Sequence, residues 1–193
     1  MPGAMGPRVL FGRDDRAIQV RLLMLDTEDG KHWDAVLFRP RTGPPARHRL
    51  AVVVVHGSVG NYLTGLPRRV GFGLAGAGFT VLSINTRMAN YGVFFGGGLM
   101  HRTPLDIDAA LALLRRLGFQ RIVLCGFSMG SAMVTNYQAL RRPDDVVGVA
   151  TLAHPRSLPE ALRGRWERFG ATPSYAEVTA EARARLAPDP ETL

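Results

Sequence analysis

The sequence contains a single cysteine, a single lysine and no long apolar run. One cysteine, Cys125, excludes a disulfide framework and a metal site built from cysteines. No apolar run approaches the roughly 20 residues that a membrane helix requires. The amino-terminal residues lack an apolar segment after a basic start, so no secretory signal is predicted. We therefore expect a cytoplasmic protein without a membrane span.

Lysine is nearly absent although the chain is basic, with a formal net charge of +8. Lys31 is the only lysine among the 24 lysine and arginine residues, and the arginines are scattered along the whole chain. The longest basic groupings lie within residues 39–49, in a loop rich in proline and glycine. This loop lacks the interleaved aromatic residues that single-strand binding uses. We interpret the charge as a preference for arginine over lysine and predict no nucleic-acid partner.

The chain has 193 residues, of which 46% are hydrophobic, and this fits one globular domain with a sizeable core. We expect residues 1–193 to form a single domain. Its core should cover about residues 17–154, and the segment 155–193 should be helical.

Strand and helix patterns alternate along the predicted core. The run LAVVVV at 50–55 has no polar face, so it must be covered on both sides, as strands of a parallel sheet are. Two earlier strands flank the turn signal Asp29-Gly30 and predict an antiparallel hairpin at a sheet edge. The sequence therefore predicts an α/β fold with a mostly parallel sheet and helices on both faces. The expected strands are 17–25, 33–39, 50–55, 79–85, 121–125 and 146–152, and the expected helices are 66–77, 104–117, 129–141, 158–169 and 175–186.

The strongest motif is Gly126-Phe127-Ser128-Met129-Gly130, which directly follows a predicted buried strand and opens a predicted helix. A nucleophile elbow presents its serine at the tip of such a strand–turn–helix. Gly126 and Gly130 would let the strand and helix backbones approach closely. We predict that Ser128 is a nucleophile. The alternative is a plain turn in which the serine caps the helix.

A second motif, His56-Gly57-Ser58-Val59-Gly60, lies at the carboxyl end of the 50–55 strand, the edge at which open α/β sheets form their sites. Such a turn can aim a backbone N–H at the oxyanion of a tetrahedral intermediate, with the Met129 N–H as a second donor. We expect Ser58 to supply the first donor, with Gly57 as the alternative. His56 should shape the loop rather than act as a base.

The two motifs, together with the strand–helix order between them, resemble the α/β-hydrolase superfamily. The resemblance covers roughly residues 17–154, which would form the first six strands of an eight-stranded fold. It implies a serine hydrolase, similar to carboxylesterases, that acts on ester, thioester or amide carbonyls through an acyl-enzyme. The stretch 85–98 also resembles the loop that borders the substrate pocket in bacterial members.

The sequence departs from this family after the elbow. Family members carry the triad acid and histidine on loops after later strands. Only 65 residues follow Ser128, and His154 is the one histidine among them. Asp144 and Asp145 precede His154, but they lie where the chain enters the 146–152 strand, at the opposite edge of the sheet from Ser128. We expect His154 to face the active-site edge, as a base or as a pocket residue, unless it only caps the strand before Pro155. We expect the isolated chain to be an incomplete hydrolase.

Two functions stay open from the sequence alone. The first is a serine hydrolase with a small-molecule acyl substrate. The second is a catalytically inactive, hydrolase-like domain that binds a small ligand or a protein partner. An exposed apolar face where later strands would lie would favour a homodimer. No metal or cofactor is predicted. The match to a dinucleotide fingerprint at 71–76 lies inside a predicted helix, whereas such a fingerprint should follow a strand directly.

Overall fold

The computed structural model describes residues 9–14, 17–41, 49–90 and 100–185. Its contacts divide the chain into two compact units, Met1–His154 and Pro155–Leu193. This division lies between the predicted core and the predicted helical segment. The expectation of a single domain over residues 1–193 stays a prediction.

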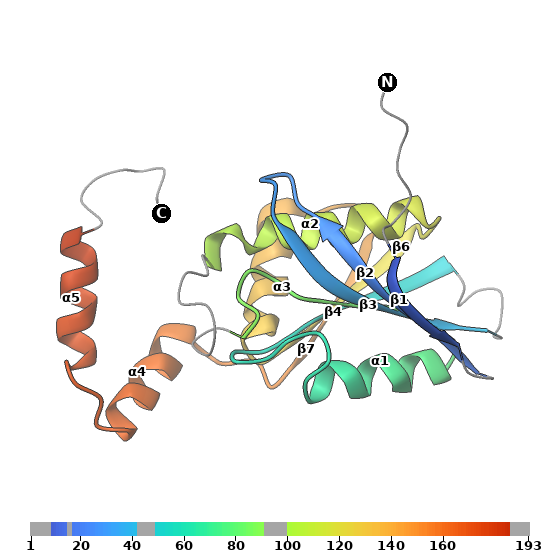
Figure 1. The fold of residues 1–193 in the computed structure, drawn as a ribbon. Helices are drawn as coiled ribbons and strands as arrows, with labels where there is room; N and C mark the ends of the chain where they lie inside the picture. The colour runs from blue at the N-terminus through green and yellow to red at the C-terminus, as the bar shows by residue number, and fades with distance from the viewer. Residues whose placement is uncertain (1–8, 15–16, 42–48, 91–99, 186–193) are drawn as a thin grey trace. The chain divides into compact units, whose positions relative to one another are not determined.

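The first unit is built on one sheet of seven strands, in the order β1-β2-β3-β5-β4-β6-β7 (Figure 1). The strands β1, β2, β3 and β5 pair antiparallel, whereas β5, β4, β6 and β7 pair parallel. The α/β prediction and the antiparallel hairpin of β2 and β3 are therefore confirmed. The hairpin does not form the sheet edge, however, because β1 pairs with the outer side of β2. The strand bounds are Val9–Asp14 (β1), Ile18–Asp26 (β2), His32–Pro40 (β3), Leu50–Val55 (β4), Thr80–Ile84 (β5), Arg121–Phe127 (β6) and Val146–Leu152 (β7).

The strand β1 was not predicted from the sequence. It has six residues, VLFGRD, with a glycine in the middle and two charged residues at its end. Val9 and Phe11 favour a strand, but the glycine and the two charged residues after them leave only a short apolar run. It is a strand because it pairs with β2, and its register shifts between Val9 and Phe11.

Helices cover both faces of the sheet, as predicted. Figure 1 shows α1 (Leu66–Gly76) on one side and α2 (Thr103–Arg116) and α3 (Met129–Arg141) on the other. Val52 and Val54 of β4 belong to the same buried cluster as Ala75 of α1. Because side chains alternate along a strand, Val53 and Val55 face the opposite side, and both are also buried. The short helix η2 (Met100–Arg102) leads into α2.

The second unit consists, in its described part, of α4 (Leu158–Arg168) and α5 (Tyr175–Arg185). The Ser157 hydroxyl caps α4 by accepting a hydrogen bond from the Glu160 N–H at 3.3 Å. Neither helix has a buried residue. Across the described ranges, the helices are too short or too polar to cross a bilayer.

Candidate functional site

Ser128 lies between the end of β6 and the first residue of α3, Met129. Its backbone has φ 54° and ψ −118°, a conformation that residues with side chains rarely adopt. Its side chain makes no hydrogen bond that caps α3. The serine is therefore held in a strained turn without being used as a helix cap.

Two glycines make this turn sterically feasible. A Cβ atom on Gly126 would lie 2.3 Å from the Gly130 carbonyl oxygen. A Cβ atom on Gly130 would lie 2.4 Å from the carbonyl oxygens of Val55 and His56, on the neighbouring strand end. Both contacts are with backbone, which cannot move aside. The glycines thus allow the close approach of strand and helix that the motif predicts.

A buried serine that the sequence analysis missed ties the elbow to β7. The Ser131 hydroxyl donates to the Gly126 carbonyl oxygen at 2.7 Å and accepts from the Leu152 N–H at 3.3 Å. The Ser128 N–H donates to the Leu152 carbonyl oxygen at 2.8 Å. These bonds bring the end of β7 to the base of the elbow.

The turn after β4 lies directly against the elbow. A Cβ atom on Gly57 would be 3.1 Å from the Ser128 Cβ and 3.2 Å from the Phe127 carbonyl oxygen. Ser58 follows Gly57 and is half-buried, and Val59 has φ 57°, an uncommon value for a β-branched residue. The fold therefore brings the two predicted motifs into contact at the carboxyl ends of β4 and β6.

His56 is completely buried and its ring is hydrogen-bonded at both nitrogens. Nε2 accepts from the Thr86 backbone N–H at 3.2 Å, so this nitrogen carries no proton. The proton therefore lies on Nδ1, which is 2.8 Å from the Gly57 carbonyl oxygen and donates to it. Burial lowers the pKa of the imidazole, although the bond to Gly57 opposes this effect. A neutral ring with both nitrogens engaged is suited to holding the turn.

His154 is exposed and follows β7 by two residues. Since Leu152 lies at the base of the elbow, the chain reaches His154 near the edge of the sheet where Ser128 is found. Asp145 lies at the other end of β7, where it accepts two hydrogen bonds from Arg115, both at 2.7 Å. The strand therefore separates Asp144 and Asp145 from the elbow, as expected.

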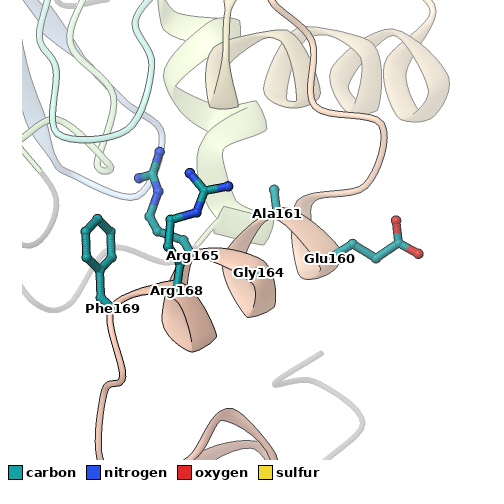
Figure 2. Close-up of a pocket in the computed structure, with 6 residues that line it drawn as sticks. All are labelled: Glu160, Ala161, Gly164, Arg165, Arg168 and Phe169. Atoms are coloured by element: carbon teal, nitrogen blue, oxygen red, sulfur yellow. The ribbon is translucent and has the colours of Figure 1, made fainter.

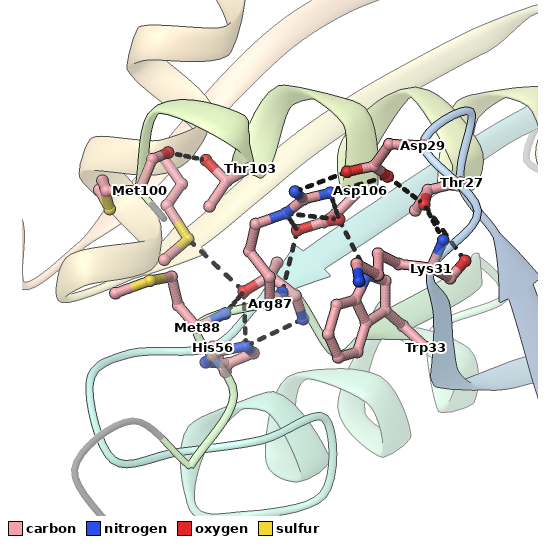
Figure 3. A network of polar contacts seen from close by, with 12 residues as sticks. Thr27, Asp29, Lys31, Trp33, His56, Arg87, Met88, Met100, Thr103 and Asp106 are labelled. Atoms are coloured by element: carbon pink, nitrogen blue, oxygen red, sulfur yellow. Dashed lines mark hydrogen bonds and ion pairs between the residues drawn. The ribbon is translucent and has the colours of Figure 1, made fainter. Parts of the chain in front are cut away.

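A polar network behind His56 was also missed by the sequence analysis (Figure 3). Its members are Thr86, Arg87, Asp106, Trp33 and Asp29, which come from four different parts of the chain. Thr86 could have been suspected, because it follows a predicted strand directly. Asp106 could not be recognised from the sequence as a member of this network, because an acidic residue is common in the first turn of a helix.

The predicted pocket loop falls largely on residues 91–99, which lie outside the described ranges. A hollow of about 600 Å³ lies along α4 (Figure 2) and is lined by Glu160, Ala161, Gly164, Arg165, Arg168 and Phe169. Within the described ranges, no group of three or more His, Cys, Asp or Glu residues could hold a metal ion.

Solved structures of several esterases have the same fold. A cold-adapted esterase from an Arctic intertidal metagenomic library is 19% identical, with a TM-score of 0.63 over 76% of this chain and 65% of that one. The esterase Pf2001 of Pyrococcus furiosus is 20% identical, with a TM-score of 0.64 over 88% and 64% of the two chains. Brefeldin A esterase, a bacterial homologue of human hormone-sensitive lipase, is 23% identical, with a TM-score of 0.55 over 76% and 42%.

These similarities show that the chain has the α/β-hydrolase fold, as the two motifs predicted. The chain spans about two thirds or less of the length of these three esterases. No family model and no curated protein matches the sequence.

Proposed function

We propose that this chain carries the nucleophile and the oxyanion hole of a serine hydrolase that acts on small acyl substrates. Ser128 Oγ attacks the carbonyl carbon of an ester, thioester or amide, and its proton passes to a base. The leaving group departs with a proton, and water then hydrolyses the acyl-enzyme. The fold shared with esterases supports this reaction class.

The observation that carries the proposal is the packing of Gly57 against Ser128 at a strained elbow. An oxyanion hole needs two N–H groups within reach of the atom that the nucleophile attacks. The turn after β4 provides Ser58, and the first residue of α3 provides Met129. Within the described ranges, no hydrogen bond engages either N–H group. The Gly57 N–H is the alternative first donor.

His154 is our candidate for the base, because it follows the strand end that is hydrogen-bonded to the elbow. Its position after β7 differs from that of the usual triad histidine, which follows a later strand. A pocket-lining role is the alternative. His56 is not a candidate base, because the Thr86 N–H occupies Nε2 and Nδ1 donates to Gly57.

The test is covalent labelling by a fluorophosphonate, in which a Ser128 Oγ–phosphorus bond forms and fluoride leaves. We expect mass spectrometry to locate the label on Ser128, and Ser128→Ala to abolish it. Ser157→Ala is the matched control, because it removes a serine hydroxyl that caps α4 and takes no part in the proposed site. It should label at close to the wild-type rate.

A second comparison tests the base. His154→Ala should slow labelling by about 10²-fold or more, as expected for the loss of a general base. His32→Ala should have no effect, because it removes an exposed histidine that pairs with Asp26. Equal labelling of His154→Ala would leave His154 as a pocket residue. A folded wild-type protein that no fluorophosphonate labels would favour the inactive, ligand-binding alternative.

A further inference from the structure

Thr86, whose N–H donates to the His56 ring, lies in a loop that is also hydrogen-bonded to α2. Consecutive backbone N–H groups of this loop donate in two directions: Thr86 to His56 Nε2 at 3.2 Å, and Arg87 to Asp106 Oδ2 at 2.9 Å. The Thr86 hydroxyl lies 3.0 Å from His56 Nε2 and accepts from the Met88 N–H at 3.2 Å. The loop after β5 therefore lies between the His56 ring and α2.

Asp106 is the anchor of this arrangement. It is completely buried in the first turn of α2, and four N–H groups donate to its carboxylate. They are Arg87 N at 2.9 Å, Arg87 Nε at 3.1 Å, Arg87 Nη2 at 2.8 Å and Trp33 Nε1 at 2.9 Å. Burial raises the pKa of the Asp106 carboxyl, and the hydrogen bonds from Arg87 and Trp33 together with the charge of Arg87 oppose this effect.

Asp29 completes the network from the turn between β2 and β3 (Figure 3). Its carboxylate accepts from Arg87 Nη1 at 2.9 Å and from the Thr27 hydroxyl at 2.6 Å. The hydrogen bond from Arg87 is the main reason that the pKa of Asp29 falls to about 2. Asp29 is the more exposed partner, since its side chain is 21% exposed and that of Asp106 is fully buried.

The contacts form a continuous path from α2 to the elbow. Asp106 holds the Arg87 backbone, and the adjacent Thr86 holds His56. His56 holds the Gly57 carbonyl, and Gly57 packs against Ser128. Each contact in this path joins buried or half-buried groups. Because packed groups leave little empty space around them, a displacement of Asp106 should also displace Gly57.

We propose that Asp106 and Thr86 are positioning residues that hold the turn of Gly57 and Ser58 at the distance from Ser128 that oxyanion binding needs. This inference rests on the proposed function of Ser128. It does not make Asp106 or Thr86 a catalytic residue, because the path acts through His56 and the turn.

The test compares three conservative variants of the full chain. Asp106→Asn removes the anchoring charge, Thr86→Val removes the hydroxyl beside Nε2, and Asp108→Asn is the matched control. Asp108 lies two residues after Asp106 on α2, but it accepts from Tyr137 at 2.6 Å and lies outside the path. Loss of one oxyanion donor typically slows a reaction by about 10²–10³-fold. We expect the first two variants to slow fluorophosphonate labelling at least tenfold and Asp108→Asn to leave it unchanged.

The rate and the extent of labelling separate positioning from mere stability. A variant that only destabilises the fold lowers the fraction of molecules that label. A displaced turn lowers the maximal labelling rate of the molecules that do label, with little change in the half-saturating probe concentration. Thr86→Ser, which keeps the hydroxyl, should restore most of the rate lost in Thr86→Val.

A second readout does not depend on activity. ¹⁵N NMR of the His56 ring should show the neutral Nδ1–H tautomer in the wild type and in all variants, because the Thr86 backbone N–H remains. The Nε2 chemical shift should move in Thr86→Val, which loses the hydroxyl beside Nε2, and should stay unchanged in Asp108→Asn. Wild-type protein that shows this tautomer but does not label would refute the proposed function alone. Thr86→Val and Asp106→Asn with the wild-type labelling rate and Nε2 chemical shift would overturn the positioning role. If Asp106→Asn does not fold, Thr86→Val and its serine rescue decide the question.

Discussion

At the residue scale, the polar residues Ser128 and His56 of the candidate site differ in whether their side chains are already engaged in hydrogen bonds. Ser128 has a strained backbone and a hydroxyl that does not cap its helix. His56 has both ring nitrogens engaged and no exposed surface. The first arrangement leaves a group available for chemistry, and the second uses a group to hold other atoms in place.

The buried His56 makes stability depend on pH. Burial lowers the pKa of this imidazole below its ordinary value of 6.5 in the folded protein. Below pH 6.5 the unfolded chain therefore binds a proton that the folded chain does not, and acid favours unfolding. We expect the free energy of unfolding to fall by up to about 1.4 kcal/mol per pH unit between pH 6.5 and the lowered pKa.

Urea unfolding at pH 7.5 and pH 5.5 measures this effect, and His56→Gln is the control. The difference in stability between the two pH values should be smaller in His56→Gln, because glutamine does not titrate. An equal difference in both proteins would mean that His56 takes up its proton normally in the folded state.

At the element scale, the site depends on how closely α3 approaches the ends of β4 and β6. Gly126 and Gly130 allow this approach, since a Cβ atom on either would lie within 2.4 Å of backbone oxygen atoms. The strand and the helix would have to separate to accept a methyl group. Such overpacking commonly costs about 1–3 kcal/mol, and more where the neighbour is rigid.

We therefore expect Gly126→Ala and Gly130→Ala each to lower the free energy of unfolding by at least about 2 kcal/mol. Gly73→Ala is the matched control, because it lies within α1 and a Cβ atom there would have no neighbour within 4 Å. This change should stabilise the protein by up to about 1 kcal/mol, since alanine favours helix. Thermal unfolding of the three variants gives the comparison, and a neutral Gly130→Ala would contradict the close approach.

At the scale of the whole molecule, β7 is the outermost strand of the described sheet at its parallel side. Three of its apolar residues are substantially exposed: Val147 at 47%, Val149 at 37% and Leu152 at 36%. The strand contains no charged residue and no proline, which are the usual protections of a sheet edge. An unprotected edge of this kind favours pairing with another chain.

An exposed strand edge of this kind is where the homodimer predicted from the sequence would form. We expect the wild-type chain to self-associate in the micromolar range and Val149→Lys to shift it toward the monomer, because a charge on an edge strand opposes pairing. Leu63→Lys is the control, since it adds the same charge at an exposed apolar residue outside the sheet. Sedimentation velocity over a concentration series measures the shift. A wild-type chain that is monomeric throughout would exclude this role for β7.

Local patterns in the sequence were sufficient for most of the elements. Runs such as LAVVVV, and the turn signal Asp29-Gly30, predicted strands and a hairpin because burial and turn geometry depend on neighbouring residues. The elbow was predictable for the same reason: the glycines, the serine and the flanking strand and helix lie within a few positions of one another. The contact of Gly57 with Ser128 also followed from the rule that parallel strands end at the same sheet edge.

Only the tertiary structure decided which residues support the site. The Thr86 N–H meets His56 across 30 residues of chain, and Trp33 meets Asp106 across 73. The pairing of β1 with β2 likewise depends on the partner strand rather than on the residues of β1. Contacts of this kind leave no periodic pattern, because they arise when the folded sheet brings distant polar groups together in a space that excludes water. The sequence thus determined the elements and the two motifs, and tertiary packing determined how His56, Thr86 and Asp106 hold them together.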